Sequence, residues 1–241
     1  MKFPGRLFSK KKLTTASIPG NAADKRISAI YSAYQQAGQP TGHLKKLGLQ
    51  FVNKAFDIDL KDISARISKH EVNYIDIYPG EHYNLLAAMI AVMRPKTVIE
   101  LGTHLGYSAL SMKKYMPPAG KLYTFDVVPW NGFDNTILKT EDFDGQLIQC
   151  VDDLTDESIF QKYKPVVEDA ELIFMDALKD GVQEYKFLKN FSGIQFRNKC
   201  LFVFDDIRLW NMLDIWFHME KPKLDLTSFG HWSGTGLVEW N

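Results

Sequence analysis

The stretch that decides the fold is residues 98–111, VIELGTHLGYSALS. It opens on an apolar strand pattern, passes through a tight turn and ends on a helical pattern. Gly102 lets the backbone of the turn approach a ligand, and Gly106 stands where the helix begins and leaves its first amide groups open. This Gly-x-x-x-Gly spacing differs from the Gly-x-Gly-x-x-Gly pattern of dinucleotide binding. Glu100 puts a carboxylate beside the turn, which suits a ligand that bears an ammonium group.

The alternation of strand and helix continues along the chain after residue 78. Strands are expected at 97–101, 122–125, 146–150, 171–175, 200–204, 224–229 and 236–240, and helices at 81–94, 107–115, 157–163, 182–191 and 212–220. Strands that alternate with helices predict a parallel sheet covered on both faces, and the last two strands predict an antiparallel hairpin. We therefore expect a Rossmann-like α/β domain over residues 78–241, with ligands at the carboxyl ends of its strands.

Residues 1–77 differ from the rest because their helical pattern is broken. Helices are expected at 22–36, from Thr41 as an N-cap to Phe56, and over a short segment at 60–67. We treat this region as a basic tail and helical extension of the main domain. Two roles are open for its helices, which are to cover the active site or to form the surface of a homodimer.

The bulk composition excludes several classes of protein. The formal net charge is zero, but the first 12 residues hold five basic side chains and no acidic one, which leaves a net charge of −5 for the remainder. A mildly acidic body argues against nucleic acid as a partner. The longest apolar stretch, Leu85–Met93, is too short to span a membrane, and the N-terminus lacks the apolar segment of a signal peptide. Cys150 and Cys200 lie in strand patterns and are expected to be buried thiols. We expect a cytoplasmic protein without stable membrane insertion.

The motif ELGTHLGYSA at residues 100–109 resembles the first motif of the catechol O-methyltransferase group and its bacterial relatives. The resemblance implies the class I methyltransferase fold, a mostly parallel seven-stranded sheet that ends in an antiparallel hairpin, and S-adenosyl-L-methionine as the cofactor. It assigns the methionine end of the cofactor to the turn and its neighbours, which are Glu100, Gly102, Thr103, His104, Gly106, Tyr107 and Ser108. The alternative is a generic strand–turn–helix unit whose glycines serve packing.

Acids at later strand ends extend this cofactor site. Asp126, followed by Val127, ends the second strand one crossover after the turn, where a carboxylate can accept hydrogen bonds from both ribose hydroxyls. By resemblance, the loop of Asp152 reaches the adenine amino group and Asp176 lies beside the cofactor. A solvated acidic turn is the alternative for Asp152.

Three carboxylates follow two strands that are expected to be neighbours. Asp176 follows the fourth strand, and Asp205 and Asp206 end the fifth. Crowded like charges are costly unless a cation neutralises them, and oxygen ligands suit a hard divalent ion such as Mg²⁺. The sequence therefore predicts a metal site at these three residues. The alternative is that the aspartates cap helices, above all Asp206.

The same residues resemble those of the metal-dependent O-methyltransferases of the catechol and caffeoyl-CoA types. That group carries Asp-x-x-Lys after the fourth strand, matched by Asp176 and Lys179, and Asp-Asn after the fifth, where Asp206 replaces the Asn. The extra charge favours a tighter grip on the ion or another divalent metal. The resemblance makes Asp176 and Lys179 catalytic residues. We expect Lys179, close to a cation and partly dehydrated, to have a depressed pKa and to take the proton of the acceptor. The alternative for Lys179 is a solvated charge at a helix start.

Two positions depart from the group and concern the acceptor. Leu178 stands where the group places an aromatic side chain against the adenine, and Ala177 offers no polar contact. A catechol or CoA-ester acceptor is therefore not implied.

Candidate acceptor-binding residues lie further along the chain. Trp210 follows the aspartate pair, and His231 and Trp232 lie in a glycine-rich segment near the C-terminus, where they could form an acceptor surface. An aromatic-anchored hairpin is the alternative. His82 and Tyr83, just before the first core helix, are candidate lid residues.

The sequence as a whole predicts methyl transfer from S-adenosyl-L-methionine to a hydroxyl oxygen of a small molecule, for example a sugar or secondary metabolite, assisted by Mg²⁺ or another divalent cation. Two alternatives stay open. One is a metal-independent N- or O-methyltransferase, and the other is a cofactor-binding protein without catalysis.

Overall fold

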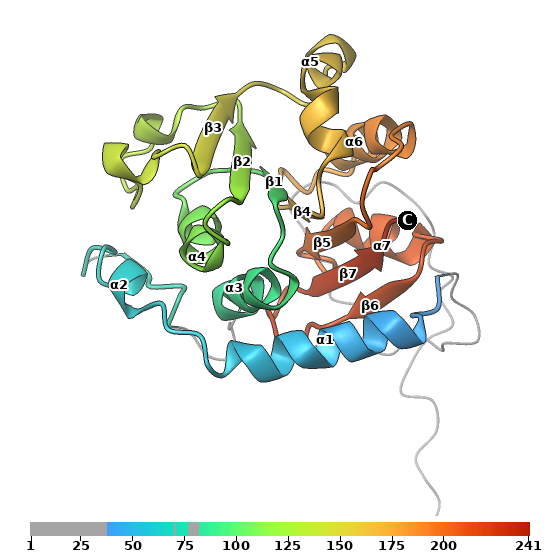
Figure 1. The fold of residues 1–241 in the computed structure, drawn as a ribbon, viewed down its shortest axis with the longest axis horizontal. Coiled ribbons are helices and arrows are strands. Elements are labelled where there is room, and N and C mark those ends of the chain that lie inside the picture. The colour runs from blue at the N-terminus through green and yellow to red at the C-terminus, as the bar shows by residue number, and fades with distance from the viewer. Residues whose placement is uncertain (1–37, 70, 77–81) are drawn as a thin grey trace, which may run out of the picture.

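Seven strands form one sheet in the order β3-β2-β1-β4-β5-β7-β6 (Figure 1). The computed structural model describes residues 38–69, 71–76 and 82–241, so the helix expected at 22–36 lies outside the described residues. The strands are β1 (Thr97–Leu101), β2 (Lys121–Asp126), β3 (Leu147–Val151), β4 (Leu172–Met175), β5 (Leu201–Asp205), β6 (Lys223–Asp225) and β7 (Thr235–Glu239). Strands β1 to β5 are parallel, and β7 runs antiparallel between β5 and β6. The predicted parallel sheet with an antiparallel closing pair is confirmed.

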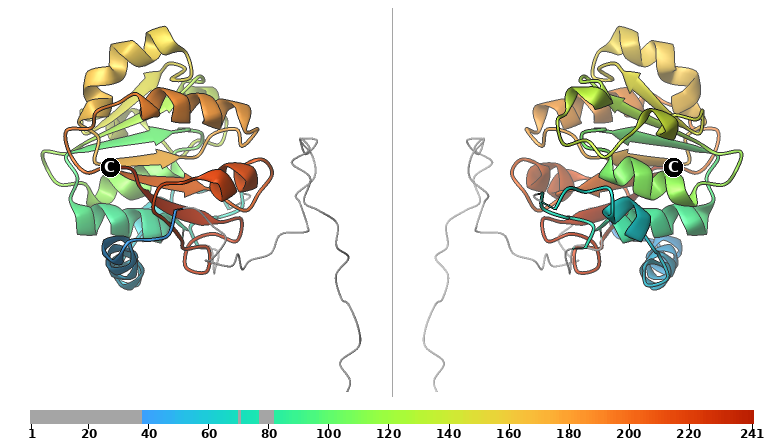
Figure 2. Two further views of the ribbon diagram at one scale, coloured as in Figure 1. Left: turned by 90° about the vertical axis from the view of Figure 1, so that its right-hand side faces the viewer. Right: turned by 90° about the vertical axis from the view of Figure 1, so that its left-hand side faces the viewer.

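Seven helices accompany the sheet in the described part of the chain. They are α1 (Gly42–Ala55), α2 (Lys61–Ser64), α3 (His82–Met93), α4 (Tyr107–Tyr115), α5 (Glu157–Glu168), α6 (Val182–Ser192) and α7 (Met212–His218). Two short 3-10 helices, η1 (Trp130–Gly132) and η2 (Thr140–Asp142), lie between β2 and β3. The views in Figure 2 show helices on both sides of the sheet, as the alternating pattern predicted.

Several elements differ in length from the prediction, most clearly β6 and α5. β6 ends at Asp225 instead of residue 229, because the Asp225 carboxylate accepts hydrogen bonds from the Thr227 amide (2.9 Å) and hydroxyl (2.6 Å) and so turns the chain. α5 continues past residue 163 to Glu168, and its extra turn buries Val167 in the core.

The core has one layer on each face of the sheet, because alternate strand residues point to opposite faces. The layer shared with α1, α3 and α4 takes Val98, Leu122, Leu147, Leu172, Phe174, Leu201, Val203 and Leu237 from the strands. The layer shared with α5, α6 and α7 takes Ile99, Leu101, Phe125, Cys150, Ile173, Met175, Phe202, Phe204 and Val238. Cys150 and Cys200 are free and buried, as predicted.

The extension is fastened to the main domain through α1, which packs along α3 and against β6 and β7 (Figure 1). Thr41 caps α1 as predicted, since its hydroxyl accepts a hydrogen bond from the Leu44 amide (2.9 Å). The same hydroxyl donates to Glu239 at the end of β7 (2.5 Å), and His43 contacts the other oxygen of Glu239 (2.6 Å). α1 therefore completes the core of its own chain. No helix among the described residues is long and apolar enough to cross a membrane.

Candidate active site

The turn after β1 depends on Gly102 for a steric reason. Gly102 has φ of +103°, and a Cβ placed there would lie 2.0 Å from the Asp176 carbonyl oxygen at the end of β4. Gly106 begins α4 with φ of +86°, and a Cβ there would lie 2.3 Å from the Leu138 side chain. Both glycines are therefore required by packing within the chain. Because Gly102 has no side chain, the ends of β1 and β4 lie close together at the edge of the sheet where we expected ligands.

Asp126 joins the ends of β1 and β2. One of its carboxylate oxygens accepts a hydrogen bond from the His104 amide (3.0 Å), and the other accepts one from the Val128 amide (3.0 Å). Each oxygen retains a second lone pair. Asp126 is half-buried and faces a cavity, so this carboxylate is held in place while it can still accept hydrogen bonds from a ligand.

A cavity of about 450 Å³ lies at the carboxyl ends of β1 to β4. Six of the predicted cofactor residues line it, namely Gly102, His104, Asp126, Val127, Asp152 and Asp176. The other lining residues are Leu101, Phe125, Val128, Phe133, Asp153, Leu154, Ala177, Leu178, Lys179, Gln183 and Phe187. This lining mixes apolar walls with a few acids, as is typical of sites for organic ligands.

Five predicted cofactor residues do not line this cavity, and they are Glu100, Thr103, Gly106, Tyr107 and Ser108. The Thr103 hydroxyl is buried against that of Thr124 (2.7 Å). Glu100 is fully buried, and the hydroxyls of Ser108 and Thr124 are its neighbours. Burial raises the pKa of Glu100 to about 8, so this group is neutral in the free chain at pH 7.

Asp152 makes contacts that the sequence did not predict. Its carboxylate accepts hydrogen bonds from Lys162 (2.9 Å) and Tyr163 (2.5 Å), both on α5. These bonds, with the charge of Lys162, lower the pKa of Asp152. The neighbouring Asp153 accepts a bond from the Thr155 amide (2.8 Å) and also lines the cavity. Both acids at the end of β3 therefore border the cavity while they hold the loop to α5.

Lys179 lies among the three acids that were predicted to bind metal. Its ammonium group donates a hydrogen bond to Asp176 and lies 2.9 Å from an oxygen of Asp206. The sequence led us to expect a depressed pKa for Lys179, and this is wrong for the arrangement in the structure. Burial alone would lower the pKa, but the charges of Asp176, Asp206 and Asp205 outweigh burial and raise it above its ordinary value. Lys179 is therefore a firmly charged ammonium group.

Asp205 and Asp206 are adjacent in sequence but opposite in electrostatic behaviour. Burial, together with the charges of Asp176 and Asp206, raises the pKa of Asp205 well above its usual range. Burial would also raise the pKa of Asp206, but its interactions with His231, Lys179 and Ser233 lower it. The environment thus favours the neutral form of Asp205 and the ionised form of Asp206.

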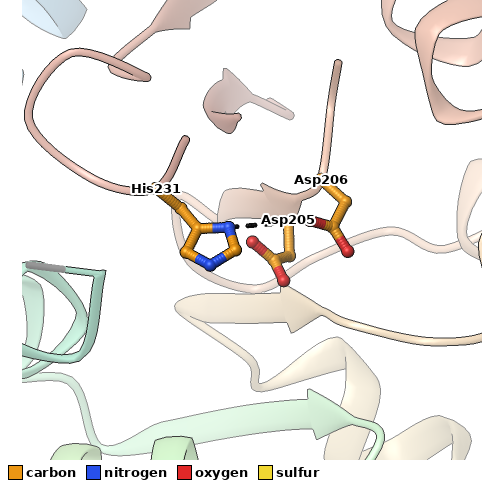
Figure 3. Close-up of side chains that lie close together, drawn as sticks. All are labelled: Asp205, Asp206 and His231. Atoms are coloured by element: carbon orange, nitrogen blue, oxygen red, sulfur yellow. Dashed lines mark ion pairs between the residues drawn. The ribbon is translucent and has the colours of Figure 1, made fainter. Parts of the chain in front are cut away.

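Two histidines face this pair. His231 Nδ1 lies 3.6 Å from one oxygen of Asp206, as Figure 3 shows. His82 Nδ1 lies 3.7 Å from an oxygen of Asp205, and the two imidazole rings are 5.3 Å apart. His82 is buried, which lowers its pKa to about 3 and keeps it neutral. His82, which was predicted to be a lid residue, is therefore buried beside Asp205 in the charged cluster.

The C-terminal loop carries His231 to Asp206 by backbone pairing. The Arg208 amide donates to the Ser233 carbonyl (2.8 Å), and the Ile207 amide donates to the Gly234 carbonyl (3.3 Å). Gly234 has φ of +110°, and a Cβ there would lie 2.6 Å from the side chain of Ile207. The segment after β5 and the loop before β7 are thus packed too closely for a larger residue.

Backbone strain is concentrated at the predicted site. Five described residues other than glycine have φ in the left-handed region, and four of them are predicted site residues, namely His104, Lys179, Asp206 and Trp210. Such a conformation costs about 1 kcal/mol or more for a residue with a Cβ, and it persists where the surrounding structure enforces it. Its recurrence here indicates that the fold holds these residues for a purpose other than stability.

Glu184 is a residue of the site that the sequence analysis missed. It is buried, and its two oxygens accept hydrogen bonds from the amides of Lys179 (2.6 Å) and Gly181 (2.9 Å). This carboxylate clamps the strained turn that carries Lys179. The signal was present in the sequence, because Glu184 occupies the third position of α6 as in a capping box.

The aromatic acceptor candidates are less closely tied to the cluster. Trp232 is 69% exposed, and its ring lies 5.9 Å from that of His231. Trp210 is half-buried, and no hydrogen bond or ring stacking joins it to the charged residues among those the structure describes. The structure thus brings His231 and Trp232 together, whereas Trp210 stays a predicted acceptor residue.

The charged cluster has the chemistry of a cation site. Asp205, Asp206 and His231 offer ligand atoms that all lie within 4.8 Å of one another. One oxygen of Asp205 is buried without a hydrogen-bond partner, although Asp205 belongs to this group. The donor set fits a divalent ion, but it differs from the predicted set because it includes His231 and excludes Asp176.

Comparisons with known proteins agree with this geometry. A family model described as O-methyltransferase matches residues 56–213. Catechol O-methyltransferase of Mus musculus is 25% identical over 169 residues, which cover 68% of this chain and 55% of the mouse protein. The match thus spans about half the length of that relative. The SAH-bound methyltransferase PaMTH1 of Podospora anserina is similar in structure, with a TM-score of 0.52, 16% identity, and coverage of 86% of this chain and 91% of that one. At that identity the likeness establishes the fold alone, which is Rossmann-like.

Proposed function

The chain belongs to the O-methyltransferase family, and from this premise we propose that it transfers the methyl group of S-adenosyl-L-methionine to a hydroxyl oxygen of a small molecule. The observation that carries the proposal is that the cavity and the charged cluster adjoin each other. The cavity bounded by Gly102 and Asp126 is also lined by Asp176 and Lys179, and Lys179 pairs with Asp206 in the charged cluster. A methyl donor in the cavity would therefore lie next to a group of charges that can orient an acceptor oxygen.

The cavity supplies contacts suited to each part of the cofactor. Asp126 keeps lone pairs for ribose hydroxyls, and Val127, Leu154 and Phe187 offer apolar walls for a flat base. Glu100, which does not line the cavity itself, is a buried carboxyl group on the strand that leads into the turn. An ammonium group near Glu100 would favour its ionised form. When bound, the cofactor supplies an electrophilic methyl group on a sulfonium.

The protein's own contribution is alignment. The acceptor oxygen must approach the methyl carbon opposite the sulfur, so the reaction gains most from groups that fix that direction. Lys179 is held by two carboxylates and by the clamp of Glu184, and its ammonium can donate a hydrogen bond to an acceptor oxygen. A divalent cation at the aspartates would lower the pKa of the acceptor hydroxyl. The role of Lys179 as proton acceptor stays a prediction, and its raised pKa favours the role of a fixed charge.

Turnover of an acceptor library is the direct test. The full chain would be incubated with S-adenosyl-L-methionine carrying an isotope-labelled methyl group and with sugars, phenols and hydroxylated metabolites, both with a panel of divalent metals and with a chelator. We expect label on an oxygen of at least one acceptor, and loss of product with the chelator. Amines are added to the library to test the opposite outcome, because label only on nitrogen would contradict oxygen as the acceptor atom.

The alternative of a metal-independent transferase has one observation in its favour. Lys179 already neutralises part of the charge of Asp176 and Asp206. Undiminished turnover in the chelator would therefore favour the alternative.

A further inference from the structure

The loop between β2 and β3, residues 127–146, forms one wall of the cavity. Val127, Val128 and Phe133 line the cavity from this loop. The centre of the Phe133 ring lies 5.1 Å from that of the His104 ring, in the turn after β1. The regular elements of the loop are two short 3-10 helices, η1 and η2. The shape of this wall therefore depends on contacts that the loop makes with other parts of the chain.

The two halves of this loop are held by different partners. In the first half, the Gln149 side chain on β3 accepts a hydrogen bond from the Trp130 amide (2.9 Å) and donates one to the Val128 carbonyl (3.3 Å). In the second half, the Ile137 amide donates to the Leu105 carbonyl (3.1 Å) in the turn after β1. The second half of the loop is therefore bonded directly to the turn that borders the cavity.

Arg66, from the N-terminal extension, reaches the second half of the loop. One nitrogen of its guanidinium donates hydrogen bonds to the Asp142 carboxylate (2.7 Å) and to the Ile137 carbonyl (3.3 Å). The same oxygen of Asp142, a buried residue, accepts a hydrogen bond from the Lys139 amide (2.8 Å). Ile137 is thus bonded to Leu105 through its amide and to Arg66 through its carbonyl. The loop is held between the turn and the extension.

The buried Asp142 carboxylate depends on Arg66 for its neutralising charge. The side chain of Asp142 is 7% exposed, and it pairs with the Arg66 guanidinium. The neighbouring cation Lys113 bonds to the carbonyl oxygen of Asp142 (2.5 Å) and pairs with the carboxylate of Asp144 (3.0 Å). Removal of one partner from a buried ion pair is strongly destabilising, because the other charge stays buried without compensation. The second half of the loop is therefore expected to shift when the guanidinium is lost.

We propose that Arg66 is a positioning residue for the cofactor, because it fastens the N-terminal extension to the loop that forms one wall of the cavity. The inference rests on the proposed function, in which this cavity holds S-adenosyl-L-methionine. Arg66 is not among the residues that line the cavity, so it acts on the cofactor through the loop. The extension thereby has a role that differs from the two left open by the sequence, since it supports the cofactor site from within the same chain.

The test is the affinity of the full chain for S-adenosylhomocysteine, measured by calorimetry without an acceptor. We expect Arg66→Met to raise the Kd about tenfold. Arg66→Lys keeps a charged nitrogen donor, and one nitrogen makes both contacts in the wild type, so its Kd should return to within about threefold of the wild-type value. Hydrogen exchange gives the local readout. In Arg66→Met the amides of residues 133–143 should exchange faster, while those of β1 and β4 keep their protection.

Lys114→Met is the matched control. Lys114 also joins the extension to the main domain, through the Asp59 carbonyl (2.6 Å) and the Asp62 carboxylate (2.5 Å), but it does so from α4. Because this exposed ion pair does not involve the loop, we expect the Kd for S-adenosylhomocysteine to stay within about twofold of the wild-type value. An equal loss of affinity in Lys114→Met and Arg66→Met would overturn the specific role of Arg66.

A double variant guards against misfolding of the first. Arg66→Met with Asp142→Asn leaves no unpaired carboxylate at position 142, so we expect it to fold and to bind S-adenosylhomocysteine no more weakly than Arg66→Met alone. Fully additive losses from the two substitutions would mean that the residues act separately, and would overturn the proposal. Wild-type binding with unchanged affinity in Arg66→Met and in the double variant would overturn the inference and leave the proposed function standing. A wild-type chain that does not bind S-adenosylhomocysteine would remove the proposed function and this inference with it.

Discussion

The two halves of the site hold their acids in different ways. At the ends of β1 and β2, the Asp126 carboxylate is fixed by two backbone amides, and no charged side chain pairs with it among the described residues. At the ends of β4 and β5, Asp176 and Asp206 are held by the Lys179 ammonium, and Asp205 is buried beside two histidines. The first half is therefore organised by neutral dipoles and tight packing, and the second by charge. A neutral, preformed wall suits recognition of a ligand, whereas a balanced charge cluster responds to what binds there.

The largest effect is expected in the packed half, at Gly102. Gly102→Ala adds a Cβ at 2.0 Å from a backbone carbonyl as well as the cost of positive φ, and we expect the free energy of unfolding to fall by more than about 3 kcal/mol. Gly145→Ala is the matched control, because Gly145 has φ of +90° and open space around it, and it should cost only about 1 kcal/mol. Urea unfolding of both variants measures the difference. Equal losses would mean that the close approach of β1 and β4 is not required.

In the charged half, the largest effect is expected from Lys179. Lys179→Met leaves Asp176 and Asp206 without their cation, and we expect turnover to fall roughly 10³-fold, with cofactor affinity within a few-fold of the wild type. Lys179→Arg keeps the charge but cannot release a proton at neutral pH, so it should retain activity within about tenfold of the wild type. Steady-state kinetics separate the two roles. An Arg variant as inactive as the Met variant, with normal cofactor binding, would restore Lys179 as the proton acceptor.

A smaller effect is expected at Glu100, in the form of a pH dependence. The pKa of this carboxyl group is raised from 4.5 to about 8 on folding, so between these values the folded chain binds more protons than the unfolded chain. Stability therefore falls as the pH rises through that interval. Glu100→Gln removes this titration, and its unfolding free energy should decline less than that of the wild type between pH 5 and pH 8, by about 1–3 kcal/mol. Thermal unfolding across pH gives the two curves, and parallel curves would show that Glu100 is not buried as a neutral acid.

The smallest effect is expected at Glu184, which holds the Lys179 turn by two amide hydrogen bonds. Glu184→Gln keeps one carbonyl acceptor and loses the other, so we expect a stability loss of about 1–2 kcal/mol and a lower kcat with little change in the KM for the cofactor. Glu157→Gln, at an exposed position in the first turn of α5, is a control for the loss of a carboxylate near a helix start. A change in KM with kcat intact would mean that Glu184 acts on the cavity wall instead of the Lys179 turn.

The difference between the two halves of the site also explains which features could be predicted from the sequence. β1 and α4 were predicted to the residue, and the parallel sheet followed from the alternation of strands and helices, because these features depend on neighbours in sequence. Gly102 was singled out correctly, but its packing against Asp176 depends on a neighbouring strand. The pKa of Lys179 is raised first by Asp176, which the local Asp-x-x-Lys pattern contains, and then by Asp206 and Asp205, whose approach depends on a neighbouring strand.

The least predictable part of the site is the pair of histidines. His231 reaches Asp206 through the β5–β7 pairing and a glycine-rich loop, and His82 reaches Asp205 from the start of α3. Neither histidine lies near the aspartates in sequence, so the residues alone suggested an acceptor surface and a lid.

The most direct measurement is a crystal structure of the full chain with S-adenosylhomocysteine and Mn²⁺, with the anomalous signal of the metal recorded. We expect the nucleoside in the cavity beside Asp126, and the metal at the acids that follow β4 and β5. A nucleoside bound away from this cavity, or a metal bound away from these acids, would contradict the arrangement described above.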